Sequence, residues 1–209
     1  MELMARRIAE EANRTERFVQ LAIRSGDLPA LRNVGRAAIV DDIAATAWAR
    51  RLGRGRRWGD EVRDAALDLL TAGETERLSS SERSRLRARL RTMRAPAIAH
   101  AAGGLGADWS RYRVDGVPDL PRVGPSALDP APLGIVPGDG WVTFVAAPDL
   151  GRLELSHDVV LDADGNLGVV ERPHPDARDA RVLLDTYLLG DARLSAAAAT
   201  ELESRAHGL

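Results

Sequence analysis

The chain has 209 residues, and its 29 arginines face 31 aspartates and glutamates, for a formal net charge of −2. At roughly 100–200 residues per domain this length fits one large or two small domains, and a 44% hydrophobic content argues against disorder throughout. Because there is no cysteine, disulfides, thiolate metal sites and cysteine nucleophiles are excluded.

The charges are separated along the chain. Residues 1–100 contain 20 Arg and 14 Asp or Glu, a net +6, whereas residues 101–209 contain 9 Arg and 17 Asp or Glu, a net −8. The absence of lysine is typical of a GC-rich genome, but such a genome does not explain the separation of signs. We therefore expect the two halves to have different partners, with a polyanion as the partner of the first.

Membrane and export signals are lacking in the sequence. No apolar run approaches the roughly 18–20 residues of a spanning helix, and the opening MELMARRIAEEA has acids where a signal peptide has its apolar stretch. We expect a cytoplasmic protein with no membrane partner.

The first fifty residues predict short helices followed by a hairpin. Residues 8–12 belong to a first helix, 13–15 form a tight corner with Thr15 as N-cap, and 25–29 stop the second helix with Gly and Pro. The buried stripe of that second helix is predicted to be Phe18, Val19, Ala22 and Ile23.

The run from 30 to 40 is too short for another helix and predicts two short strands with a turn at Asn33 to Gly35. Asp41 or Asp42 then caps a helix that reaches Arg51, with Ile43 and Trp48 among its buried residues.

A basic, glycine-containing loop at 52–58 precedes a helix from about Asp60 to Leu70. Ser79 and Glu82 fit a capping box that opens an arginine-rich helix extending to about Met93. Its arginines alternate by two, so they spread around the helix, which favours a solvated helix over a single binding face.

After Pro96, glycine and proline exclude long helices until the C-terminal region. Strands are predicted at 141–146 and at 159–161, the latter paired with 167–170 across a turn at 162–166. Two helices follow, at about 176–189 and 195–206. The domain boundary lies at 103–106, or at Pro96.

The N-terminal features resemble the excisionase-like branch of the MerR-type winged helix-turn-helix. The resemblance lies in residues 9–12, 15–24 and 23–30, and in Gly35-Arg36 before Ile39. In that family the second helix enters the major groove and the wing grips the neighbouring backbone. By position, the resemblance implies that Arg14, Thr15, Arg17 and Gln20 face DNA. It implies phosphate contacts for Arg24 and for the wing residues Arg32, Asn33 and Arg36. Ala37 and Ala38 depart from the family, whose wings often carry basic or aromatic residues there.

The densest basic cluster lies just beyond this region. It consists of Arg50, Arg51, Arg54, Arg56 and Arg57. This cluster would extend a phosphate footprint on double-stranded DNA, with Arg54, Arg56 and Arg57 as its predicted DNA-binding residues; the alternatives are an acidic protein partner or a solvated loop.

Residues 53–90 and the tail 179–201 are similar to actinobacterial helix-turn-helix proteins that act as antitoxin-like partners in two-gene toxin–antitoxin loci. The resemblance implies a transcriptional regulator that represses its own operon and binds a cognate toxin through its C-terminal half. The alternative is a helix-turn-helix transcription factor whose C-terminal domain senses a small ligand or dimerises. A palindromic operator would make it a homodimer, and a large apolar pocket within 107–175 would favour the ligand sensor.

Signals for catalysis are weak. The calcium-like run 162–166 has Leu167 and Pro173 where the calcium loop needs Gly and Glu. The pair Asp162 and Asp164 lacks the upstream Gly-Ser turn of nucleotidyltransferases, and the four histidines show no metal-ligand spacing. We expect no enzymatic activity, no cofactor and no metal.

The resulting prediction is an α+β protein: a winged helix-turn-helix at 1–51, a basic helical extension at 52–95, and an acidic α+β partner-binding domain at 96–209.

Overall fold

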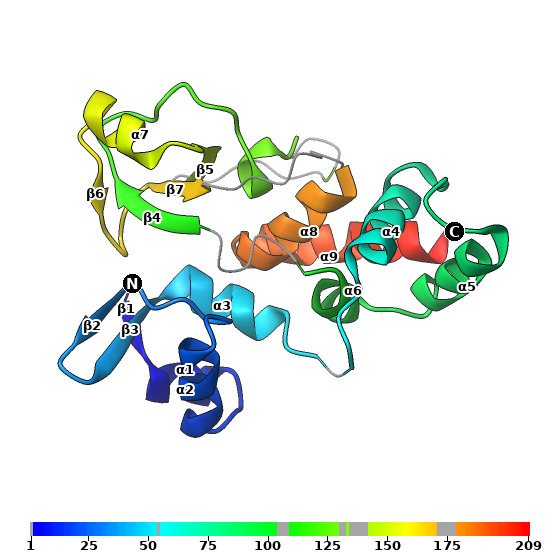
Figure 1. The fold of residues 1–209 in the computed structure, drawn as a ribbon, viewed down its shortest axis with the longest axis horizontal. Helices are drawn as coiled ribbons and strands as arrows, with labels where there is room; N and C mark the ends of the chain where they lie inside the picture. Colours follow the sequence, from blue (N-terminus) through cyan, green and yellow to red (C-terminus); the bar gives the residue numbers. More distant parts are fainter. Residues whose placement is uncertain (1, 54, 104–108, 130–132, 134–141, 171–178) are drawn as a thin grey trace. The chain divides into compact units, whose positions relative to one another are not determined.

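The computed structural model describes residues 2–53, 55–103, 109–129, 133, 142–170 and 179–209. These residues form a mixed α+β protein with nine α-helices and two small sheets (Figure 1). The chain divides into two compact units that are each assembled from separate segments: unit 1 from Met1–Ala49, Leu105–Ser126 and Pro137–Pro173, and unit 2 from Arg50–Gly104, Ala127–Val136 and His174–Leu209. Segments of the two units therefore alternate along the chain, whereas each of the three predicted domains is one continuous segment.

The N-terminal part of unit 1 contains the predicted short helices and hairpin, together with an additional strand. In chain order its elements are β1 Glu2–Met4, α1 Ala5–Glu11, α2 Glu16–Arg24, β2 Arg32–Val34, β3 Ala37–Asp41 and α3 Asp42–Arg50. The strands form an antiparallel sheet in the order β1-β3-β2. β1 was not predicted, because three residues carry no alternating pattern; it is held by pairing with β3, where Leu3 lies opposite the buried Val40.

The core beneath these elements is small. Val19 of α2, Val40 of β3 and Trp48 of α3 are each 1% exposed or less. The predicted stripe of α2 is correct for Val19 and Ala22 and wrong for Phe18, which is 42% exposed although its ring lies 5.8 Å from that of Trp48. Ile23 is half-buried.

The second sheet of unit 1 has the strand order β5-β7-β4-β6. Its strands are β4 Trp109–Arg113, β5 Thr143–Ala146, β6 Val160–Leu161 and β7 Leu167–Val170, with the 3-10 helix η1 Gly124–Ala127 and the helix α7 Leu150–Ser156 between them in the chain. β5 and β7 are parallel, and β4 is antiparallel to both β7 and β6. The predicted pairing of 159–161 with 167–170 is therefore wrong, because β4 lies between the two strands.

The turn at 162–166 explains this arrangement, since it closes around β4. The Asn166 amide brackets Val114, accepting from its backbone N–H and donating to its carbonyl, both at 3.0 Å. A Cβ on Gly165 would lie 2.1 Å from the Tyr112 carbonyl oxygen, so only glycine fits there. The core of this sheet contains Tyr112, Val114, Val145, Ala147, Leu153, Leu167 and Val169.

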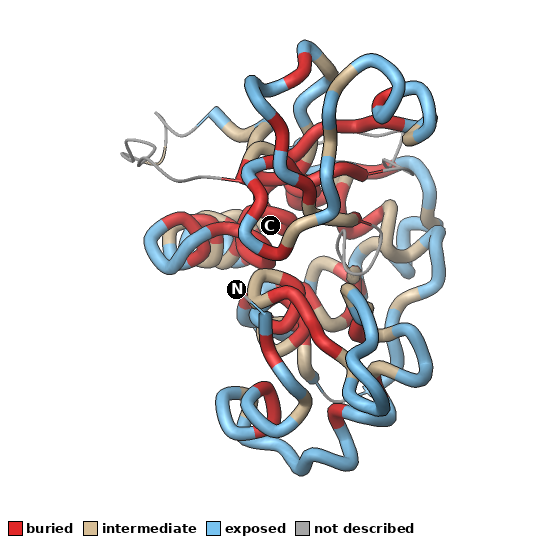
Figure 2. Tube along the Cα trace, turned by 90° about the vertical axis from the view of Figure 1, so that its left-hand side faces the viewer, coloured by how far each residue is buried: buried red, intermediate tan, exposed pale blue. Residues whose placement is uncertain are grey.

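In unit 2 the helices pack together, and three of them contact one buried helix. They are α4 Asp60–Ala72, α5 Ser80–Leu90, α6 Ala95–Ala102, α8 Asp179–Leu189 and α9 Ala192–His207. Every residue of α8 from Ala180 to Leu189 is buried, as expected of a helix surrounded on all sides. Along the described chain, buried residues (red in Figure 2) gather in helices and strands, whereas turns are largely exposed.

Helix α6 was not predicted, because Pro96 was interpreted as the start of a region without long helices. Proline lies in the first turn of α6, where its missing N–H does not interrupt the helix. The first N–H of that helix, from Ala95, donates to the Glu203 carboxylate at 3.0 Å, and Arg94 donates to the same group at 2.7 Å. These two donors hold the pKa of Glu203 below its usual value.

Arg50 fixes the C-terminal end of α8. Its Nη1 donates to three carbonyls at the end of that helix: Tyr187 at 3.1 Å, Leu188 at 2.8 Å and Gly190 at 2.7 Å. The last carbonyls of a helix have no partner within it, and a cation there is favoured by the helix dipole. Burial lowers the pKa of Arg50, so the bonds to carbonyl oxygens stabilise a partly desolvated charge.

No helix in the described ranges combines the length and the apolar character that a bilayer crossing needs.

Asp41 connects the two parts of unit 1. One carboxylate oxygen accepts from the N–H groups of Ile43 at 2.9 Å and Ala44 at 3.2 Å, so Asp41 is the N-terminal cap of α3. The other lies 3.3 Å from Nη1 of Arg111 on β4, and Asp42 lies 3.2 Å from the same nitrogen. Burial raises the pKa of Asp41, and the Arg111 guanidinium opposes that effect.

This geometry predicts a pH-dependent stability that the Asp41→Asn variant lacks. A raised pKa means that the folded state binds the Asp41 proton more tightly than the unfolded state, so this group's contribution to stability is full below its unfolded pKa. It is lost as pH rises through the folded value. We expect the free energy of unfolding of the wild type, relative to Asp41→Asn, to fall from about pH 4 towards neutrality in urea titrations.

Asp41→Ala provides the comparison, because it also removes the cap. We expect it to be less stable than Asp41→Asn by about 0.5–2 kcal/mol at every pH. If the free energies of unfolding of the wild type and of Asp41→Asn change with pH in parallel, the raised pKa of Asp41 is contradicted.

Candidate nucleic-acid interface

The corner between α1 and α2 has the predicted position. Asn13 adopts a positive φ of 51°, a left-handed conformation that Asn tolerates better than most residues. The Arg14 N–H donates to the Ala9 carbonyl at 2.9 Å, which closes the corner. Thr15 caps α2 as predicted, its hydroxyl accepting from the Phe18 N–H at 3.3 Å.

The exposed face of α2 contains Arg17 and Gln20, two of the four residues predicted to face DNA, and Arg24, which was predicted to lie on a phosphate. Arg17, Gln20 and Arg24 are three or four residues apart, so they lie on one side of the helix, opposite the buried Val19 and Ala22. Arg17 has no carboxylate within ion-pair distance among the described residues. Gln20 donates to Glu16 at 3.0 Å, and Arg24 donates to the Gln20 carbonyl at 3.4 Å.

Leu21 belongs to the same exposed face, and sequence reasoning missed it. It is 49% exposed and lies four residues after Arg17 and next to Gln20. The helical spacing itself could have identified it, since a leucine outside the buried stripe of an amphipathic helix faces away from the core.

The β2–β3 hairpin has a two-residue turn at Gly35 and Arg36, instead of the predicted turn at Asn33 to Gly35. Gly35 has a φ of 60° at the first turn position, the conformation that selects glycine in such hairpins. Asn33 lies in β2 opposite Ala38, and both Asn33 and Arg36 are exposed. The turn therefore presents Arg36 at the tip of the hairpin.

Arg32 is already paired. It donates to both carboxylate oxygens of Glu2, from Nε at 3.0 Å and from Nη2 at 2.8 Å. This pairing raises the pKa of Arg32 and neutralises the charge that the sequence assigned to a phosphate contact. Glu2 is therefore a second residue that sequence reasoning missed, because β1 was not expected.

The remaining predicted residues belong neither to α2 nor to the hairpin. Arg14 is exposed and donates to the neighbouring Asn13 carbonyl at 3.0 Å. Arg54 lies outside the described residues, and Arg56 and Arg57 are exposed in a loop of unit 2. Of the basic cluster, Arg50 and Arg51 are not available to a ligand, because Arg50 is bound to α8 and Arg51 is 8% exposed.

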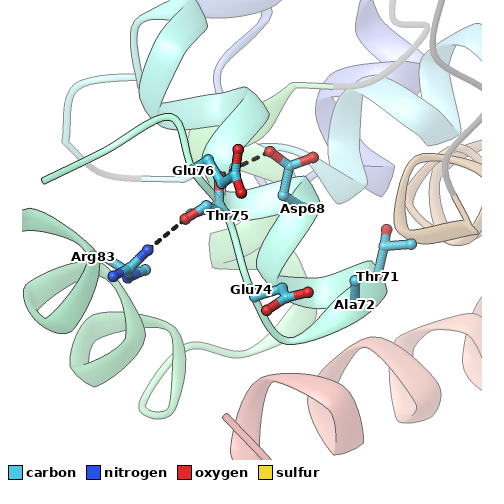
Figure 3. A pocket seen from close by; sticks show the side chains of 7 residues that line it. All are labelled: Asp68, Thr71, Ala72, Glu74, Thr75, Glu76 and Arg83. Carbon is cyan, nitrogen blue, oxygen red and sulfur yellow. Dashed lines mark hydrogen bonds between the residues drawn. The ribbon is translucent and has the colours of Figure 1, made fainter. Parts of the chain in front are cut away.

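An open pocket of about 550 Å³ lies at the loop between α4 and α5. It is lined by Asp68, Thr71, Ala72, Glu74, Thr75, Glu76 and Arg83 (Figure 3). Its polar groups bond to one another: Thr75 donates to Asp68 at 2.9 Å, and Arg83 donates to the Thr75 carbonyl at 2.7 Å. The polar groups that line the pocket are therefore used to hold the α4–α5 loop in its fold. The pocket also lies outside residues 107–175, where a ligand-sensing domain was expected to have its pocket.

Other reactive groups show no catalytic arrangement within the described ranges. Ser156 Oγ lies 2.9 Å from Nδ1 of His157, but the hydroxyl also bonds the Arg152 carbonyl at the end of α7. Among the described residues no group of three or more His, Asp or Glu side chains is placed to hold a metal ion.

Comparison of the chain with protein families, with curated proteins and with solved structures gave no match.

The cap of α2 provides a stability test of the element on which this face depends. We expect Thr15→Ala to lower the free energy of unfolding by about 1 kcal/mol, because the N–H of Phe18 loses its acceptor. Thr15→Ser retains a hydroxyl and should be affected less. Urea unfolding with an unchanged m-value measures both, and equal destabilisation of the two variants would contradict the capping role.

Proposed function

We propose that this chain is a DNA-binding transcriptional regulator with a winged helix-turn-helix. In this proposal α2 reads operator DNA, the β2–β3 hairpin is the wing, and the protein represses its own operon. The observation that carries the proposal is the exposed polar face of α2, which follows a capped three-residue corner and precedes a hairpin with Arg36 at its tip.

The chemistry of this face suits a major groove. Arg17 can donate two hydrogen bonds to a guanine edge, and the Gln20 amide can bond an adenine edge once it leaves Glu16. Leu21 offers an apolar contact for a thymine methyl group. Arg36 at the hairpin tip can neutralise a backbone phosphate.

The proposal includes a second partner, a cognate toxin protein that binds the C-terminal half. Its support is a set of exposed apolar side chains on α7 and on the edge strand of the second sheet. Leu155 of α7 is 92% exposed, and Val160 and Leu161 of the edge strand β6 are 59% and 49% exposed. Acidic residues surround them in the chain: Asp149, Glu154, Asp158, Asp162 and Asp164. An apolar edge with acidic neighbours fits a basic polypeptide that adds a strand to the sheet.

We expect the double variant Arg17→Ala/Gln20→Ala to lose preference for the native promoter over scrambled DNA while its unfolding transition is unchanged. Fluorescence anisotropy with both duplexes measures this preference. Each bidentate base interaction contributes about 1–3 kcal/mol of discrimination, so removing two should reduce the preference by roughly 30-fold or more. Equal preference before and after the substitution would refute the assignment.

Two further variants are matched controls. Arg6→Ala, an exposed arginine paired with Glu10 on α1, should leave the preference intact. Glu2→Gln frees Arg32 and should tighten binding to both duplexes to the same extent, because a released guanidinium reaches phosphate and carries no sequence information.

For the protein partner, we expect the product of the neighbouring gene to co-purify with the full chain and not with Leu155→Arg/Val160→Arg. Both positions are exposed, so the substitutions add positive charge without removing core packing. Val117→Arg, an exposed apolar position outside β6 and α7, is the control. Co-purification that survives the double variant would rule out this edge as the binding site.

A further inference from the structure

The positive charge of the first half lies outside the proposed reading face. Residues 1–49 contain seven Arg and seven Asp or Glu, whereas residues 50–104 contain 13 Arg and seven Asp or Glu. The positive charge of residues 1–100, which predicted a polyanion as partner, therefore comes from residues 50–104 and not from α2 and the hairpin.

Many of these arginines already have partners. Arg63 and Arg77 pair with carboxylates of α4, Arg94 pairs with Glu203, and Arg83 and Arg87 donate to backbone carbonyls of the α4–α5 loop. Such arginines are tied into the fold and offer little free charge.

A second group is exposed and is brought together by one contact. The Arg89 guanidinium of α5 lies 5.5 Å from the centre of the Trp58 ring, within the range of a cation–π interaction. Arg85 lies one helical turn before Arg89, and Arg56 and Arg57 immediately precede Trp58; all four arginines are exposed. Two segments about thirty residues apart in the chain thus form one basic surface, which we call the Trp58 surface: Arg56, Arg57, Trp58, Arg85 and Arg89.

The loop beneath the Trp58 surface is held in place. The Trp58 backbone N–H donates to the Ala101 carbonyl at 2.9 Å, and the two ring nitrogens of His100 lie 3.2 Å from the Arg51 carbonyl and 3.0 Å from the Gly55 carbonyl. Arg56 therefore sits between two points fixed to α6, which reduces the entropic cost of ordering this loop when a ligand binds.

The acids of α5 and of the first turn of α4 lie at helix N-termini. Glu82 is the one acid of α5, and it bonds the N–H and hydroxyl of Ser79 in the capping box. Asp60 and Glu61 lie in the first turn of α4, where they favour the positive end of the helix dipole, and Asp60 is paired with Arg63 at 2.9 Å.

We propose that the Trp58 surface binds the phosphate backbone of duplex DNA irrespective of sequence. Exposed guanidinium groups gathered beside an aromatic ring suit phosphates, which contribute affinity without sequence preference. The inference rests on the proposed function for the identity of the nucleic acid, and it adds an interaction that contributes affinity without operator preference.

The test is the salt dependence of DNA binding by the full chain. In a plot of log Kobs against log salt, the slope for the variant Arg85→Gln/Arg89→Gln should be less negative than the wild-type slope by about 1.8. This is about 0.9 for each of the two phosphates that are no longer neutralised. Between about 50 and 200 mM salt, wild-type affinity should therefore fall about twelvefold more than that of the variant. Arg85→Lys/Arg89→Lys keeps both charges and should retain the wild-type slope.

The control is Arg152→Gln/Arg193→Gln, which removes two charges from exposed arginines of α7 and α9. If this control flattens the slope equally, the effect is one of net charge and the Trp58 surface is refuted. An unchanged slope in Arg85→Gln/Arg89→Gln also refutes it, as does binding of heparin or duplex RNA without duplex DNA.

Operator preference separates this inference from the proposed function. Arg85→Gln/Arg89→Gln should keep the wild-type ratio of native to scrambled promoter binding. Suppose that the wild type shows no preference for the native promoter, but that replacing Arg85 and Arg89 changes the slope of its salt dependence. This result would refute the proposed operator recognition by α2 and support the Trp58 surface.

Discussion

Arginine bonded to backbone carbonyls is the interaction on which the described structure most depends. Arg50 holds the end of the buried helix α8, and Arg111 of β4 donates to the Gly165 carbonyl at 2.7 Å. Arg83, Arg87 and Arg205 do the same for the α4–α5 loop and for the last turn of α4. Helix ends leave carbonyls without intrahelical partners, and a guanidinium offers several fixed donors to satisfy them. In a chain without cysteine, these bonds link segments that are distant in sequence.

This use of arginine changes what the charge pattern means. A count along the sequence treats every arginine as free charge, but Arg50 and Arg51 are withdrawn from solvent and Arg32 is bound to Glu2. The members of the densest basic cluster therefore differ: Arg56 and Arg57 are exposed, whereas Arg50 is bound to the end of α8 and Arg51 is buried. Arg17 and Arg36 in unit 1, and Arg56, Arg85 and Arg89 of the Trp58 surface in unit 2, are exposed at positions that a phosphate can reach.

Sequence reasoning succeeded where the determining contacts are local. Thr15 and the Ser79–Glu82 capping box bond within three residues, so their helices began where predicted. Reasoning failed where a distant segment decides the structure. β1 exists because β3 pairs with it, and 162–166 is not a hairpin turn, because β4 enters between the two strands. For the same reason the proposed reading face was largely predictable, whereas the neutralisation of Arg32 and the contact of Arg89 with Trp58 were not.

The position of Arg111 bears on how a protein partner could influence the proposed reading face. β4 pairs with the edge strand β6 through Tyr112 and Leu161, and the adjacent Arg111 binds Asp41, which ends β3 and caps α3. A partner that adds a strand to β6 would thus lie one strand away from β4, whose Arg111 contacts the last residue of β3 in the hairpin. Binding at one site changes affinity at the other only if the partner has different affinities for two arrangements of this connection. Among the described ion pairs, those of Arg111 with Asp41 and Asp42 are the ones that join the two sheets of unit 1, so a rearrangement of one sheet against the other would alter these contacts.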